Sequence, residues 1–204
     1  MYKNNKIPIN KDILVGDSPI IGVVSRVSKE KNIEYLLDIA KVMPGYRFVI
    51  VGDGPLKREL ENKCSSLGIK NVIFSGYVKN THDYHNIFDA FLLPTKCDEG
   101  TPISILEAMA CSVPVFTTNY GNISSFMSNN INGFFISLDP KNDAQLIRDN
   151  INNKDIIANA KKYVEDNHNI LNIADKFSSI LLSNGSFHKK GKSPESLVVS
   201  GYYA

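Results

Sequence analysis

The sequence is poor in cysteine and carries little net charge. Its three cysteines, Cys64, Cys97 and Cys111, are widely spaced and include no Cys-x-x-Cys pair. A disulfide framework or a zinc knuckle is therefore not expected, and a reducing compartment fits the chain best. The net charge of +2, from 23 basic and 21 acidic residues, gives no field that would favour nucleic acid or an anionic membrane surface as a partner.

Long apolar runs are missing as well. No stretch approaches the roughly 18–20 apolar residues that a membrane-spanning helix requires. Residues 1–6 are polar, and no apolar stretch follows them that could act as a signal peptide. These absences predict a cytoplasmic protein. The 43% of hydrophobic residues matches ordinary globular proteins, so the chain has enough apolar side chains for a substantial core.

Short apolar runs alternate with segments of helical periodicity along most of the chain. Strands are predicted at 20–24, 48–51, 72–74, 90–93, 114–117 and 134–136, and helices at 33–43, 55–67, 83–88, 102–111 and 123–127, with two or three more to about residue 182. Such alternation indicates a parallel sheet that helices cover on both faces. The predicted fold class is α/β, a doubly wound Rossmann-like parallel sheet.

Three segments are expected. Residues 1–19 are predicted to be a linker or leader, 20–183 to form the Rossmann-like domain, and 184–204 to be a disordered tail. In doubly wound sheets, ligands bind at the carboxyl ends of the strands, near the point where the strand order reverses. Candidate site residues are therefore expected in the loops that follow the strands.

The most informative of these loops lies in the stretch 94–110. Thr101 followed by Pro102 predicts a helix start, with threonine as the N-cap and proline in the first turn. The backbone N–H groups of Ile103 and Ser104 would then point out of the helix N-terminus. Together with the positive end of the helix dipole, they form a seat for a phosphate.

Two acids of this stretch, Glu99 and Glu107, are candidates for ligand contacts. Glu107 is the only formally charged residue between Glu99 and Asp139, and it lies among apolar neighbours on the predicted helix. A buried carboxylate without partners is costly, so it either reaches the surface or hydrogen-bonds a specific group such as a ribose hydroxyl. The alternative is that Glu107 is an ordinary surface residue of an amphipathic helix and Glu99 an ordinary loop acid.

Five motifs in order carry a family resemblance. Seven residues separate Glu99 from Glu107, and Ala-Met-Ala and Val-Pro-Val follow at 108–110 and 113–115. The other four are Ser25-Arg26 with Lys31-Asn32, Gly52-Asp53-Gly54-Pro55, Phe74-Ser75-Gly76-Tyr77-Val78 and Asn132-Gly133-Phe134. In these motifs the sequence resembles the family 4 retaining glycosyltransferases of the GT-B fold, over about residues 20–182.

The resemblance implies a role for each candidate residue. Arg26 and Lys31 would neutralise the diphosphate of a nucleotide-sugar and stabilise it as it leaves. Glu99 would contact hydroxyls of the transferred sugar and Glu107 the ribose, while the loop around Val78 would border the base. Arg26, Lys31 and Glu99 are thus the catalytic candidates. The donor-binding set also includes the residues around the predicted helix start: Gly100, Thr101, Ile103 and Ser104.

The implied function is donor binding by one half of a retaining, metal-independent hexosyltransferase. The donor would be a UDP- or GDP-sugar without a further cofactor, and the acceptor a glycan or a lipid-linked molecule in polysaccharide biosynthesis. The family pairs this half with an N-terminal half that carries the acceptor site, for which these 204 residues have no counterpart. The expected partners are therefore the nucleotide-sugar and an acceptor domain or separate subunit, with peripheral membrane association through that half left open.

Four positions depart from the family pattern. Serine replaces the usual glycine at Ser25, and it does so again at Ser112, at a predicted helix end where a positive φ strains serine. Ser125 stands where the family usually has an acid. Pro102 replaces a glycine and offers no amide hydrogen to the donor.

The sequence also has other interpretations besides a donor-binding domain. The chain could be a non-catalytic nucleotide-binding partner or a truncated remnant that is inactive alone, because the acceptor half is missing. A receiver-type signalling domain shares the fold class but needs acids after the first strand, where Ser25-Arg26 is basic. His82-x-x-His85 has no cysteine or acid cluster near it in sequence, so a metal site is not expected.

Overall fold

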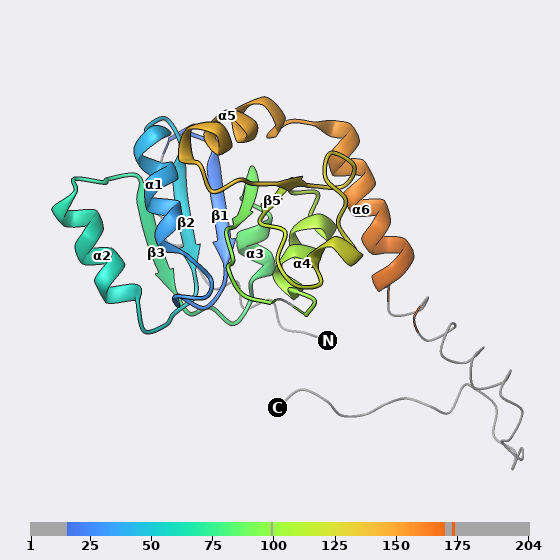
Figure 1. Cartoon of the computed structure of the whole chain (residues 1–204), viewed down its shortest axis with the longest axis horizontal. Coiled ribbons are helices and arrows are strands. Elements are labelled where there is room, and N and C mark those ends of the chain that lie inside the picture. The colour runs from blue at the N-terminus through green and yellow to red at the C-terminus, as the bar shows by residue number, and fades with distance from the viewer. Residues whose placement is uncertain (1–15, 99, 170–172, 174–204) are drawn as a thin grey trace, which may run out of the picture. The chain divides into compact units, whose positions relative to one another are not determined.

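Six short apolar segments form the strands of one sheet. The computed structural model describes residues 16–98, 100–169 and 173. The strands are β1 (Ile20–Val24), β2 (Arg47–Val51), β3 (Val72–Gly76), β4 (Ala90–Leu93), β5 (Val115–Thr117) and β6 (Phe134–Phe135). All neighbouring strands are parallel, in the order β3-β2-β1-β4-β5-β6 (Figure 1). The strand order reverses between β1 and β4. A ligand is therefore expected at the carboxyl ends of the strands near this point.

Helices separate the strands, as the periodicity predicted. They are α1 (Glu34–Val42), α2 (Lys57–Ser66), α3 (His82–His85), α4 (Ile103–Ala110), α5 (Pro140–Asn150) and α6 (Lys154–His168), with a short 3₁₀ helix η2 (Ile123–Ser125). The predicted fold class, a doubly wound Rossmann-like α/β sheet, is confirmed. The predicted tail at 184–204 and most of the predicted leader lie outside the described residues.

The chain divides into a unit of residues 1–166 and a C-terminal unit of residues 167–204, and only 167–169 and 173 of the second are described. The sheet and the candidate site belong to the first unit. No helix in the described part of the chain is both long and apolar enough to cross a lipid bilayer.

Helices cover both faces of the sheet. On one face α1 packs against α5, and on the other α3 contacts α4 (Figure 1). Right-handed crossovers explain the two layers, because the chain moves outward from β1 to β3 and then returns to place β4 on the other side of β1. Close packing of the segment after α3 on the sheet requires Gly22 in β1, since a Cβ there would lie 2.2 Å from the Phe88 ring.

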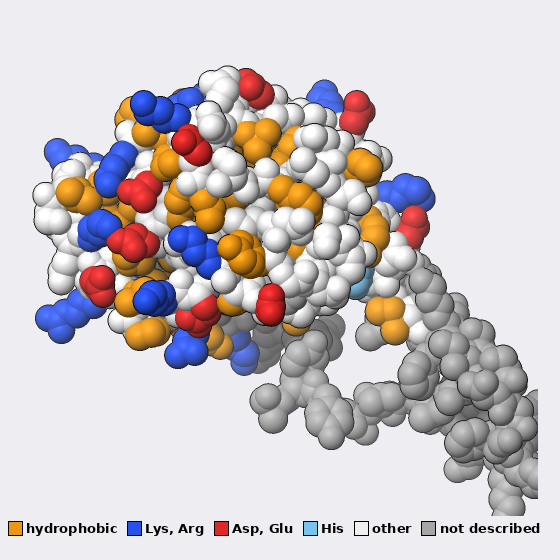
Figure 2. Space-filling model, in the orientation of Figure 1, with side chains coloured by type: hydrophobic (Ala, Val, Ile, Leu, Met, Phe, Trp, Pro, Cys, Tyr) orange, Lys and Arg blue, Asp and Glu red, His pale blue; other side chains and the backbone are white. Residues whose placement is uncertain are grey.

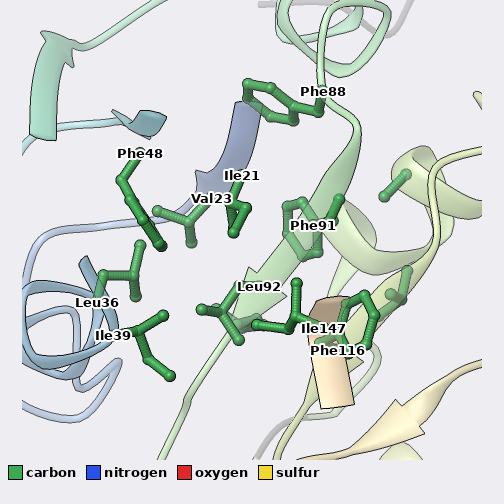
Figure 3. Packing of buried hydrophobic residues seen from close by; sticks show 14 of the residues in the cluster. Ile21, Val23, Leu36, Ile39, Phe48, Phe88, Phe91, Leu92, Phe116 and Ile147 are labelled. Atoms are coloured by element: carbon green, nitrogen blue, oxygen red, sulfur yellow. The ribbon is translucent and has the colours of Figure 1, made fainter. Parts of the chain in front are cut away.

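Large apolar side chains fill the space between the sheet and the helices. Figure 3 shows Leu36 and Ile39 of α1 on one side of Leu92, and Ile147 of α5 beside Phe116 on the other, all of them fully buried. Phe116 of β5 and Phe134 of β6 stack with their ring centroids 5.1 Å apart. Burial of each such side chain contributes about 1.5–3 kcal/mol. The sheet is thus a rigid base for the loops at its carboxyl edge.

The start of α4 differs from the prediction. Pro102 is the N-cap, with φ −68° and ψ 104°, and no side chain caps the helix. The prediction of Thr101 as the N-cap was wrong because Pro102 is itself extended rather than helical, so it takes the N-cap position and the helix begins one residue later. At the other end of the helix, Ser112 has φ 62°, the positive value that its place in the family's glycine position predicted.

A buried tyrosine–aspartate pair ties α1 to α5. The Tyr35 hydroxyl donates to Asp143 Oδ2 at 2.5 Å, and both residues are buried. Asp143 also accepts hydrogen bonds from Ser137 N and Oγ and from Leu138 N, each at 2.9 Å. Burial, followed by the bond to Asp143, raises the pKa of Tyr35, so the phenol stays neutral and remains a donor.

Replacement of Tyr35 by phenylalanine is expected to lower the free energy of unfolding by about 1–3 kcal/mol, because it takes one hydrogen bond from a buried carboxylate. Urea denaturation of the two proteins measures the difference. Tyr84→Phe is the matched control, since Tyr84 is similarly buried, at 5% exposure against 7%, and its hydroxyl bonds no described residue. Equal stability of Tyr35→Phe and the parent would contradict the assigned role.

Candidate functional site

The loops that follow β1, β2 and β3 enclose a pocket at the carboxyl edge of the sheet. Its volume is about 430 Å³. The lining residues are Val24, Ser25, Arg26, Val51, Gly52, Asp53, Tyr77, Val78 and Thr81. Arg26 and Val78 are therefore two predicted site residues that the fold brings together, from loops about fifty residues apart in sequence.

Gly52 lets the loops after β1 and β2 run against each other. Ser25 N donates to Val51 O at 3.0 Å, and Val27 N donates to Asp53 O at 2.9 Å, so the strand pairing continues into the loops. A Cβ on Gly52 would lie 1.9 Å from Ser25 O, and Gly52 has φ +138°. The Gly52-Asp53-Gly54-Pro55 motif thus builds a wall of the pocket by close backbone approach.

The pocket has an apolar floor and a charged rim. Val24, Val51 and Val78 contribute aliphatic surface, and Tyr77 extends beside them with 78% of its surface exposed. This surface suits the face of a planar base. The rim carries Arg26, which is exposed, and Asp53.

The charge of Asp53 already has partners within the protein. Its Oδ1 accepts from the Gly54 amide at 2.7 Å, and its Oδ2 lies 3.8 Å from Lys57 Nζ. The carboxylate therefore supports the turn after β2. Arg26 is left as the cation of the pocket wall that can meet an anionic ligand.

Lys31 lies in the turn before α1 and is not part of the pocket lining. It and Arg26 both act on Glu30. The pKa of Glu30 is lowered, first by the Ser28 side chain and by backbone hydrogen bonding, and then by the positive charges of Arg26 and Lys31. The two predicted diphosphate cations thus occupy one loop, with an acid between them.

Glu107 of α4 is held by α3. Its Oε2 accepts from Thr81 Oγ1 at 3.1 Å and pairs with His85 Nε2 at 3.2 Å. Thr81 lines the pocket, so this bond connects Glu107 to it. The Glu107 side chain is 40% exposed, so the carboxylate reaches the surface and also hydrogen-bonds specific groups of the protein.

The environment of Glu107 favours its ionised form. The hydrogen bond with His85 lowers the pKa of Glu107 against the opposing effect of burial, with smaller contributions from Thr81 and His82. A lowered pKa in the folded state means that the stabilisation is present above the ordinary carboxyl pKa and is lost as the pH falls through the lowered one. At neutral pH the carboxylate is therefore a pure hydrogen-bond acceptor.

The region around Glu107 is otherwise poor in charge. Residues 100–138 contain no other Lys, Arg, Asp or Glu. On the face shown in Figure 2, charged side chains gather over α1 and α2, and the part of the domain around β5 shows few. Glu107 is thus an isolated charge that two side chains hold in place.

The remaining predicted residues lie beside the pocket or outside the described chain. Gly100, Thr101 and Ile103 are exposed and Ser104 is half-buried at the start of α4, and none of them lines the pocket. Glu99 lies outside the described residues, so its predicted role in sugar binding stays a prediction.

Sequence reasoning missed the partners of Glu107. Thr81 and His85 are four residues apart, a spacing that puts them on one side of a helix, but this spacing does not point to Glu107. The sequence pattern His82-x-x-His85 suggested only a metal-ligand spacing. In the structure His85 pairs with Glu107 and His82 Nδ1 lies 3.4 Å from Cys111 Sγ. Among residues 16–98, 100–169 and 173, no cluster of three or more histidine, cysteine or acidic side chains could hold a metal ion.

Comparison with known proteins identifies the family. The family model of the glycosyl transferases group 1 matches residues 6–165. Alpha-monoglucosyldiacylglycerol synthase of Acholeplasma laidlawii is 30% identical over 145 residues, which cover 67% of this chain and 36% of that protein. The UDP-Gal:alpha-D-GlcNAc-diphosphoundecaprenol alpha-1,3-galactosyltransferase of Escherichia coli is 29% identical over 177 residues, which cover 83% and 42%. The chain thus spans roughly two fifths of the length of these relatives.

Solved structures share the fold. Anabaena HepE in complex with UDP and glucose matches with a TM-score of 0.75 at 23% identity, over 85% of this chain and 50% of that one. The C-terminal domain of LpcC, a glycosyl transferase group 1 family protein from Francisella tularensis, matches with a TM-score of 0.67 at 22% identity, over 78% and 91%. By the span of its family match and by its fold, this chain belongs to the group 1 glycosyltransferases and has the Rossmann-like architecture of one half of a GT-B enzyme.

Proposed function

We propose that this domain binds the donor, a UDP-sugar, for a retaining and metal-independent hexosyltransferase. The observation that carries the proposal is the pocket of about 430 Å³ with Arg26 on its rim and Thr81 linking it to Glu107. These features match, in order, the needs of a nucleoside diphosphate: a surface for the base, a cation for the phosphates, and an acceptor for the ribose hydroxyls.

Each part of the donor has a partner in this proposal. The base lies against Val78 and Tyr77, where the lining is apolar. The ribose hydroxyls donate to Glu107, whose charge makes these hydrogen bonds strong. Arg26 binds the diphosphate through its planar guanidinium and stabilises the charge that develops as the diphosphate leaves.

Lys31 and the start of α4 complete the diphosphate site. Lys31 adds a second positive charge from the loop that holds Arg26. The uncapped N-terminus of α4 offers the amides of Ile103 and Ser104 beside Gly100 and Thr101, where the helix dipole favours an anion. Glu99 contacts the transferred sugar, and the retaining stereochemistry follows from the family resemblance of the Glu99–Glu107 pair.

UDP is the preferred nucleotide in this proposal. HepE was solved with UDP and with UDP-glucose, and TarM of Staphylococcus aureus with UDP. The name of the Escherichia coli relative also contains a UDP-sugar. None of these proteins is described with GDP, so a UDP-hexose is favoured over a GDP-sugar.

The acceptor is proposed to bind elsewhere. The names of the Acholeplasma and Escherichia coli relatives point to lipid and lipid-linked acceptors, and this chain spans roughly two fifths of those proteins. A second half, as an N-terminal domain or a separate subunit, would supply the acceptor site, and a glycan or lipid-linked acceptor would meet the donor between the two halves.

Thermal unfolding in the presence of nucleotides tests donor binding directly. UDP at about 100 times its dissociation constant is expected to add about 2.7 kcal/mol of stability, which raises the Tm by several degrees. The measurement is made with and without EDTA, and the shift is expected to be unchanged by the chelator. Uridine, which lacks the diphosphate, is the control, and GDP is expected to give a smaller shift. The absence of any shift at millimolar UDP, in a chain that unfolds cooperatively, would refute the proposal.

A further inference from the structure

Both hydrogen bonds that Glu107 receives fall on one of its two oxygens. Thr81 Oγ1 and His85 Nε2 lie 3.1 and 3.2 Å from Oε2. Oε1 accepts no hydrogen bond from the described residues. Since the side chain is 40% exposed, one oxygen of the carboxylate is fixed by the protein and the other is open to a ligand.

The burial of His85 determines where its proton lies. The ring is fully buried, with the rings of Phe88 and Phe91 at centroid distances of 5.7 and 5.5 Å. Its Nδ1 is buried and has no hydrogen-bond partner within the described chain. A proton on Nδ1 alone would be an unpaired buried donor, so the geometry favours the tautomer with the proton on Nε2, which donates to Glu107.

Thr81 lies at the pocket, whereas His85 does not line it. The Thr81 hydroxyl donates to the same oxygen that His85 holds. Two donors, from the N-cap and the last residue of α3, therefore converge on one atom of α4. This arrangement restricts rotation of the carboxylate about its last side-chain bond, which is otherwise loose.

We infer that Thr81 and His85 are positioning residues for ribose recognition, which hold Oε2 of Glu107 so that Oε1 meets the ribose hydroxyls of the donor. The inference rests on the proposed function, since it presupposes that the pocket holds a nucleotide. Without these two donors the Glu107 carboxylate can rotate, and the nucleotide must then restrict that rotation when it binds. Recognition of the ribose hydroxyls is therefore lost first, before binding of the base or the diphosphate.

The test compares UDP with 2′,3′-dideoxy-UDP, which lacks both ribose hydroxyls, by calorimetry on the whole chain. The parent is expected to bind UDP at least tenfold more tightly than the dideoxy compound. Thr81→Val, which keeps the shape and removes the hydroxyl, is expected to weaken UDP binding about three- to tenfold. Its affinity for the dideoxy compound is expected to change less than twofold, so the preference between the two ligands collapses.

Thr81→Ser is the matched control, because it retains the hydroxyl and should keep the preference within twofold of the parent. His85→Phe is the second variant, since it keeps an aromatic ring between Phe88 and Phe91 and removes the N–H. It should reduce the preference as Thr81→Val does. Circular dichroism and a cooperative melt establish that each variant is folded before its affinity is compared.

The outcomes separate this inference from the proposed function. If the parent prefers UDP and both Thr81→Val and His85→Phe keep that preference, the positioning role is refuted while donor binding stands. If the folded parent binds UDP and the dideoxy compound equally, Glu107 does not read the ribose and the inference fails. If the parent binds neither compound, the proposed function itself fails.

Discussion

Glu107→Ala is expected to weaken UDP binding by about 10- to 100-fold. A hydrogen bond to a charged group contributes about 1.5–3 kcal/mol, and each 1.4 kcal/mol corresponds to a tenfold change in affinity. The charge is fully effective in the parent, because the hydrogen bond with His85 lowers the pKa of Glu107 and keeps the carboxylate ionised at neutral pH. Isothermal titration calorimetry of the whole chain with UDP at neutral pH measures the change.

Two further variants make the Glu107 result specific. Glu107→Gln keeps an acceptor oxygen for Thr81 and His85 but removes the charge, so we expect an intermediate loss of affinity. Glu61→Ala removes a carboxylate from α2, outside the pocket lining, and should leave the dissociation constant within about twofold. Equal affinity of the parent and Glu107→Ala would remove Glu107 from the donor site. A loss that also appears in Glu61→Ala would point to an indirect effect on the fold.

The fold was predictable because its signals are local. Continuous apolar runs such as 20–24 and 90–93, set between segments of helical periodicity, predict buried strands, and the structure has strands at those residues. The start of α4 shows the limit, since the pattern of Thr101 and Pro102 correctly predicted a helix start but not its geometry. Here Pro102 is extended instead of taking the first helical position, so it stands at the N-cap in place of threonine.

The site was predictable only in part, because its geometry depends on contacts between elements. Arg26 and Val78 could be assigned to one edge from their positions after β1 and β3, and they do line one pocket. The fixing of Glu107 could not be derived, because Thr81 and His85 lie more than twenty residues away and reach it only through the packing of α3 on α4. A lone acid in an apolar helix predicts a partner but does not identify it.

The chain offers a direct test of the close approach between the loops after β1 and β2. Gly52→Ala is expected to lower the free energy of unfolding by about 3–5 kcal/mol. At φ +138° the substitution strains the backbone by about 1–3 kcal/mol. Its Cβ would also lie 1.9 Å from Ser25 O, so the loops must separate and weaken the Ser25 N–Val51 O and Val27 N–Asp53 O hydrogen bonds, at about 1 kcal/mol each. Thermal unfolding measures the loss as a fall in Tm of about 6–20 °C.

Two other glycines distinguish the cost of backbone strain at a positive φ from the cost of the Cβ clash. Gly68 has φ +66°, and no atom lies within 4 Å of where its Cβ would be, so Gly68→Ala should cost only the backbone strain of about 1–2 kcal/mol. Gly45 has neither a positive φ nor a neighbour within 4 Å, and Gly45→Ala should be nearly neutral. The predicted order of destabilisation is therefore Gly52, then Gly68, then Gly45. If Gly52→Ala costs no more than Gly68→Ala, the two loops tolerate a side chain between them, and the pocket wall is not built by backbone contact. If the order holds, we also expect Gly52→Ala to bind UDP more weakly than the parent below its Tm, because the loop that carries Arg26 is displaced.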